Sequence, residues 1–64
     1  MTGLVRQLVD MRRAQGLTQV DVAERLGTKQ SHVSRMERTS NPSLATVERY
    51  AAAIGARLTV ELQP

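Results

Sequence analysis

Polar and cationic side chains gather at helical spacing between positions 30 and 38 of this 64-residue chain. On a helical wheel of about 100° per residue, they form one continuous arc made of Gln30, Ser31, Ser34, Arg35 and Arg38. A glutamine amide pairs with adenine N6 and N7, and an arginine pairs with guanine O6 and N7 or with a phosphate. Ser34 is small enough to lie against a groove floor. The arc therefore offers hydrogen bonding suited to the major groove of DNA; a merely solvated polar face is the alternative.

The chain lacks the side chains that an enzyme active site needs. Ser31, His32 and Ser34 are neighbours, but a catalytic triad needs partners that converge from separate elements. The chain has one His and no Cys, so we expect no catalytic residues, no zinc or other metal site and no cofactor. His32 falls between the polar and apolar arcs, and we expect it to be a packing or backbone-contact residue rather than a pH switch.

The segment from Gln19 to Arg38 has the pattern of two short helices that cross at a tight turn. Helices joined at roughly 90–120° by a 3–4-residue turn leave little room where they touch, which suits the small Ala23. Gly27 permits the left-handed backbone that ends one helix and redirects the chain, and the apolar Val33 falls on the inner side. This is the pattern of a DNA-binding helix-turn-helix. An ordinary helical hairpin in a small bundle is the alternative.

Amphipathic spacing and capping signals predict four helices. We expect them over residues 4–15, 19–26, 29–37 and 44–54. Thr18 and Asp21 resemble a capping box at the start of the second helix, and Ser43 is placed to cap the fourth. The third helix opens at Thr28 or Lys29.

The hydrophobic pattern changes near the C-terminus, where Leu58, Val60 and Leu62 alternate with polar residues over 57–62. Such alternation predicts a half-buried β-strand. A lone strand leaves backbone groups unpaired, so we expect it to pair with the same strand of a second copy across a two-fold axis. The predicted fold is mostly α, a compact four-helix domain over 1–64 with a central helix-turn-helix and this short strand. A frayed tail that folds its three apolar residues onto the core is the alternative.

Composition favours a small basic domain with a polyanionic partner. Nine Lys and Arg against six Asp and Glu give a net charge of +3. Domains shorter than roughly 70–80 residues usually need disulfides, a metal ion or oligomerisation for stability. Because the chain has no Cys and one His, we expect it to oligomerise. No apolar run approaches the roughly 18 residues of a membrane span, and the first ten residues lack a signal-peptide layout. We therefore expect a cytoplasmic protein without a membrane partner, associated with the nucleoid when it is bound to DNA.

The sequence LTQVDVAERLGTKQSHVSRMER, followed by NPSLATVERYAAAIG, resembles the Cro/phage-repressor type of helix-turn-helix, also called the xenobiotic-response-element family. The resemblance covers residues 4–55. The trailing ARLTVEL resembles more narrowly the HipB- and HigA-like antitoxins, which have a short C-terminal strand. It implies a homodimeric repressor of a pseudo-palindromic operator, the antitoxin of a toxin–antitoxin pair, with a toxin protein as a further partner. A stand-alone regulator, and a helical interaction module that does not bind DNA, are the alternatives.

Family positions complete the candidate site. Ser31 matches a base-reading position, so the resemblance adds it to the base contacts expected from Gln30, Ser34 and Arg35. Gln19 matches a phosphate-contacting glutamine, and the free N–H groups of its helix N-terminus reinforce that role. Position and chemistry add three further phosphate contacts, which are Lys29, Arg38 and Asn41. The loop over 37–42 departs from the family because it is one residue shorter than usual and lacks the usual glycine.

Arg12 and Glu37 match an internal ion pair of the family that joins the first helix to the end of the reading helix. A buried pair would orient that helix while contributing little net stability. Loss of one partner would then cost roughly 3–5 kcal/mol. An exposed, weak pair is the competing interpretation.

Overall fold

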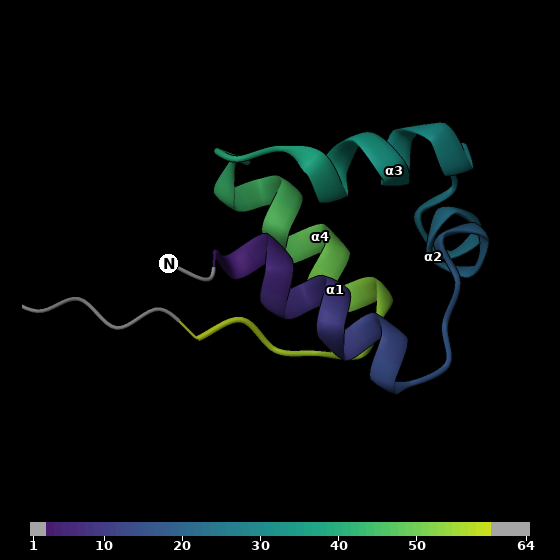
Figure 1. The fold of residues 1–64 in the computed structure, drawn as a ribbon, viewed down its shortest axis with the longest axis horizontal. Coiled ribbons are helices and arrows are strands. Elements are labelled where there is room, and N and C mark those ends of the chain that lie inside the picture. Colours follow the sequence, from purple (N-terminus) through teal and green to yellow (C-terminus); the bar gives the residue numbers. More distant parts are fainter. Residues whose placement is uncertain (1–2, 60–64) are drawn as a thin grey trace, which may run out of the picture.

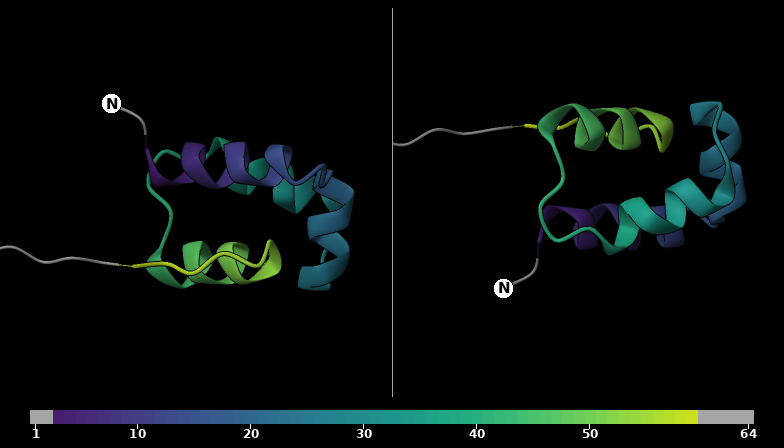
Figure 2. Two further views of the ribbon diagram at one scale, coloured as in Figure 1. Left: turned by 90° about the horizontal axis from the view of Figure 1, so that it is seen from below. Right: turned by 90° about the horizontal axis from the view of Figure 1, so that it is seen from above.

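The computed structural model describes residues 3–59 and contains four helices in that range. They are α1 (Leu4–Ala14), α2 (Gln19–Leu26), α3 (Gln30–Arg38) and α4 (Leu44–Ala53). α1 and α3 lie on one side of the molecule, α4 lies on the other, and α2 crosses one end of all three (Figure 1, Figure 2). The expected mostly α, four-helix architecture with a central helix-turn-helix is confirmed.

Local side-chain chemistry sets where α2 and α4 begin. The Thr18 hydroxyl accepts a hydrogen bond from the Asp21 backbone N–H at 3.1 Å, and the Asp21 carboxylate accepts one from the Thr18 backbone N–H at 2.8 Å. This is the predicted capping box, and the bond from the Thr18 N–H lowers the pKa of Asp21. The Ser43 hydroxyl accepts from the Thr46 N–H at 3.1 Å. Both predicted caps therefore supply acceptors to otherwise unsatisfied donors.

The turn between α2 and α3 depends on backbone conformation. Gly27 has φ 69° and ψ 35°, the left-handed geometry that ends α2. Lys29 has an extended backbone, with φ −93° and ψ 152°, and is the N-cap residue, so α3 begins one residue later than expected, at Gln30. The turn aims α3 across α2, and this crossing is what presents the outer face of α3.

The core is aliphatic and is contributed by all four helices. Val22, Val33 and Ile54 are fully buried. Ala23 is 3% exposed and belongs to the same cluster, as the helix crossing requires. Tyr50, the one aromatic residue of the sequence, is buried in this cluster with its hydroxyl directed at a carboxylate.

The chain after α4 differs from the expected strand. Residues 56–59 form no strand, and Leu58 packs half-buried against the core. In a single copy this backbone has no neighbouring strand to pair with, and Leu58 removes apolar surface from water by packing inward. The prediction of a strand is therefore wrong for 57–59. Val60 and Leu62 lie outside the described residues.

None of the helices in the described range has the length and apolar character needed to cross a membrane.

Candidate nucleic-acid interface

The outer face of α3 presents the predicted reading side chains to solvent. Gln30, Ser31 and Arg35 are exposed, and Ser34 is half-buried between them. Val33, on the opposite side of the helix, is completely buried. The crossing therefore anchors α3 by its apolar side and leaves the polar arc facing outward.

Gln19 and Gln30 join the two helices of the motif at this face. The Gln30 Nε2 donates to the Gln19 Oε1 at 2.6 Å. A residue expected to contact phosphate and one expected to read a base are thus bonded to each other. The sequence reasoning missed this contact. Its only signal was that each glutamine begins one helix of the motif.

Glu37 collects hydrogen bonds from three other helical side chains beneath this face. Its carboxylate accepts from Arg12 Nε at 2.9 Å and Nη2 at 3.2 Å, from Gln19 Nε2 at 2.9 Å, and from the Tyr50 hydroxyl. Arg12 also donates from Nη1 to the carbonyl of Leu17 at 2.8 Å. Both members of the Arg12–Glu37 ion pair are only 7% exposed at the side chain. The Arg12–Glu37 pair is thus buried, and the alternative of an exposed, weak pair is excluded.

The network sets the protonation of its members. Burial raises the pKa of Glu37, but hydrogen bonds from Tyr50, Gln19 and Arg12, with the charge of Arg12, outweigh it and hold that pKa below its usual value. Burial and the neighbouring carboxylate raise the pKa of the Tyr50 hydroxyl. Glu37 is consequently ionised near neutral pH, and Tyr50 is a neutral donor. The sequence did not predict that Tyr50 belongs to this network.

The remaining candidate phosphate contacts lie at the two ends of α3. Lys29 is exposed just before the helix, Arg38 is exposed in its last turn, and Asn41 is exposed in the following loop. The Arg38 Nε makes a long 3.4 Å bond to the carbonyl of Ser34. The structure therefore places Lys29 at one end of α3 and the other two groups at and after its other end.

His32 lies close to this face without belonging to the core. It is exposed, and its Nδ1 lies 3.0 Å from the Thr28 hydroxyl. The ring thus contacts a side-chain hydroxyl four residues earlier and does not pack in the core. Its contact with a DNA backbone stays a prediction.

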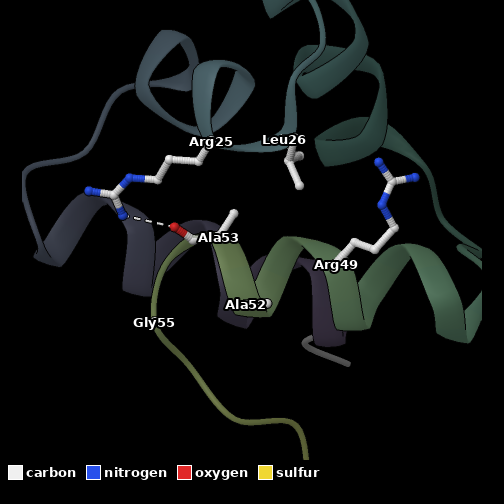
Figure 3. A pocket seen from close by; sticks show the side chains of 6 residues that line it. All are labelled: Arg25, Leu26, Arg49, Ala52, Ala53 and Gly55. Atoms are coloured by element: carbon white, nitrogen blue, oxygen red, sulfur yellow. Dashed lines mark hydrogen bonds between the residues drawn. The ribbon is translucent and has the colours of Figure 1, made fainter.

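A hollow lies between the C-terminal ends of α2 and α4, and no residue of the polar arc lines it (Figure 3). Arg25 and Arg49 flank it, and the Arg25 Nη1 donates to the carbonyl of Ala53 at 2.8 Å. Arg25 thus covers an acceptor at the end of α4, which is a structural role. Among residues 3–59 there is no cluster of His, Cys, Asp and Glu that could hold a metal ion.

Two short helices crossing at a glycine turn, with a buried inner side and a polar outer side on the second, define a helix-turn-helix protein. The chain belongs to the helix-turn-helix family of Cro/C1 type, whose family model matches residues 8–60. The resemblance inferred from the sequence is confirmed.

Two curated relatives match the chain. Both are Antitoxin HigA1 of Mycobacterium tuberculosis, one from strain CDC 1551 / Oshkosh and one from strain ATCC 25618 / H37Rv. Each is 44% identical over 61 residues, which is 94% of this chain and 41% of the relative. The chain thus spans about two fifths of the length of these relatives. No solved structure matches it.

Proposed function

We propose that this chain is a sequence-specific DNA-binding regulator that reads double-stranded DNA with α3. The observation that carries the proposal is the exposed polar arc of α3, held outward by the buried Val33 in a helix-turn-helix. In this motif the second helix enters the major groove and its N-terminal residues contact base edges. Binding is the whole activity we infer, and no reaction is catalysed.

Base recognition is assigned to four side chains of α3. Gln30 stands in the first turn of α3, where its amide can pair with adenine N6 and N7. Arg35, one turn further on, can pair with guanine O6 and N7 or reach a phosphate. Ser31 can donate or accept at a neighbouring base, and Ser34 is small enough to lie close to the groove floor.

Phosphate contacts are assigned to groups that surround the arc, namely Gln19, Lys29, Arg38 and Asn41. Phosphate contacts fix the position of a protein on the duplex, and base contacts specify the sequence. Release of counterions from neutralised phosphates makes binding weaken as salt rises. The net charge of +3 supports an attraction to the phosphates.

The active form we propose is a homodimer on a pseudo-palindromic operator with half-sites about one helical turn apart, or a multiple of it. Leu58, Val60 and Leu62 are the candidate dimerisation residues. Leu58 lies half-buried beside α1, where Leu4 and Met11 expose 40% and 43% of their surface. Removal of residues 58–64 should weaken self-association, measured by sedimentation. A truncated chain that sediments like the full-length dimer would refute this assignment.

Within this function we propose that the chain is the antitoxin of a toxin–antitoxin pair. The supporting observation is its 44% identity to two proteins named Antitoxin HigA1. A toxin encoded beside it should then copurify with the chain when the two are co-expressed. Absence of any such partner would favour a stand-alone regulator.

Selection of bound duplexes from a random DNA pool tests the central proposal. We expect enrichment of one two-fold-related motif, with the half-site spacing read directly from the selected sequences. Gln30→Ala and Arg35→Ala should each relax the preference at one base pair of each half-site. A pool without enrichment, or binding that ignores both substitutions, would favour an interaction module that does not read DNA.

A further inference from the structure

Glu37 lies behind the reading surface, yet it ends a chain of hydrogen bonds that begins at the reading residue. Gln30 donates to Gln19 at 2.6 Å, and Gln19 donates to Glu37 at 2.9 Å. The Glu37 side chain is 7% exposed, and Arg12 and Tyr50 hold it from the other side. An exposed amide is thereby tied to a buried carboxylate through one intermediate side chain.

The direction of this chain follows from the chemistry of its last member. An ionised carboxylate can only accept hydrogen bonds, and the lowered pKa of Glu37 keeps it ionised. Gln19 must therefore turn its NH₂ group toward Glu37, which leaves its Oε1 facing Gln30. Gln30 must in turn give one N–H to that oxygen. What remains free on Gln30 is its Oε1 and its second N–H.

We propose that Glu37 is a positioning residue that sets the base preference of Gln30 by fixing the polarity of both glutamine amides. This inference rests on the proposed function. A free acceptor beside a free donor complements adenine, which offers the N6 amino group and the N7 acceptor. Guanine offers two acceptors, O6 and N7. The free Oε1 of Gln30 would then face one of these acceptors, and no hydrogen bond could form between the two oxygens or between oxygen and nitrogen.

Glu37→Gln tests the polarity directly. A glutamine at position 37 can keep its oxygen on Arg12 Nε and the Tyr50 hydroxyl while it turns its NH₂ group toward Gln19, with loss of the 3.2 Å bond from Arg12 Nη2. The side-chain amides of Gln19 and Gln30 would then each exchange the positions of their oxygen and NH₂ group. Gln30 would present its NH₂ group to the base, which suits the two acceptors of guanine. We expect the adenine-over-guanine preference to fall about 5- to 150-fold, the range for one bidentate contact. The readout is the ratio of Kd values on two duplexes that differ only at the base pair located by Gln30→Ala.

Two further variants distinguish an effect on the orientation of the glutamine amides from an effect on the stability of the fold. Gln19→Leu interrupts the chain but leaves the Arg12–Glu37 pair in place, so it should reduce the same ratio even if Glu37→Gln does not fold. Tyr50→Phe is the matched control. It removes one donor to Glu37, which stays an acceptor, so stability should fall while the Kd ratio stays at the wild-type value.

A measurement on the free protein tests, without DNA, whether the Gln30 amide is held in one orientation. NMR relaxation of the Gln30 side-chain amide should show an ordered group in the wild type and an order parameter in the flexible range, below about 0.6, in Gln19→Leu. A mobile amide in the wild type would overturn the inference, as would unchanged Kd ratios in a folded Glu37→Gln or Gln19→Leu variant. If the wild type binds no duplex, the proposed function fails, and the relaxation data still decide whether the amides are fixed.

Discussion

Arg12→Met should strongly destabilise the fold, because it leaves a buried carboxylate without its cation. The substitution removes both bonds to Glu37 and the bond to the carbonyl of Leu17, and it leaves Glu37 with only Gln19 and Tyr50. Breaking a buried pair in this way costs about 3–5 kcal/mol. A domain of this length has a total stability of about 3–10 kcal/mol. The variant should therefore be close to its unfolding limit at room temperature.

The pH dependence of this loss gives a second signature. In the wild type the pKa of Glu37 is depressed, so its contribution is present above the unfolded value of about 4.3 and is lost as pH falls through the folded pKa. Without Arg12, burial is less strongly opposed and the folded pKa should rise above the unfolded one. Protonation then favours the folded state. The difference in unfolding free energy between the two proteins should shrink from about pH 7 to pH 5.

Urea unfolding followed by far-UV circular dichroism measures both effects. Arg6→Met is the matched control on the same helix, since the Arg6–Asp10 pair is 3.4 Å long and its side chains are 69% and 58% exposed. Exposed pairs at this spacing contribute about 0.3–0.5 kcal/mol. A loss below about 1 kcal/mol for Arg12→Met, as for a surface pair, would refute the reasoning that burial makes the pair matter.

The other substitutions probe the crossing, a cap and the reading face. Ala23→Leu should overpack the core and cost roughly 1–3 kcal/mol, and an unchanged Tm would contradict the tight crossing. Ser43→Ala should lose about 1 kcal/mol of stability with the cap of α4, whereas Ser40→Ala, at an exposed loop position, should change little by thermal unfolding. Arg35→Ala should cost about 1–3 kcal/mol of binding and relax one base pair. Equal weakening on every duplex would instead assign Arg35 to a phosphate.

Features set by neighbouring residues could be predicted from the sequence. The capping box of Thr18 and Asp21 and the left-handed turn at Gly27 each depend on a few consecutive positions, and both are present. The start of α3 is shifted by one residue because the backbone of Lys29 is extended, which makes Lys29 the N-cap and not the first helical residue. Sequence alone had left open whether Thr28 or Lys29 would open that helix.

Features set by the packing of distant segments could not be predicted in the same way. The bonds from Gln30 to Gln19 and from Tyr50 to Glu37 join residues 11 and 13 positions apart, and they exist only because the helices cross at a particular angle. The alternating pattern around Leu58 indicated that one side of this segment is apolar. It did not indicate which surface would bury that side. Hydrophobic period alone does not distinguish a strand of a dimer from a segment lying on its own core.

Side chains from elsewhere in the fold bond the carbonyls at the end of α4. Arg25 donates to the carbonyl of Ala53, the last residue of α4, at 2.8 Å, and Gln15 donates to that of the C-cap residue Ile54 at 2.9 Å. Helix ends usually fray, but this one is clamped by the residue after α1 and by the last turn of α2. Two separate elements therefore fix the backbone where α4 ends, so the segment that returns Leu58 to the core starts from a defined position.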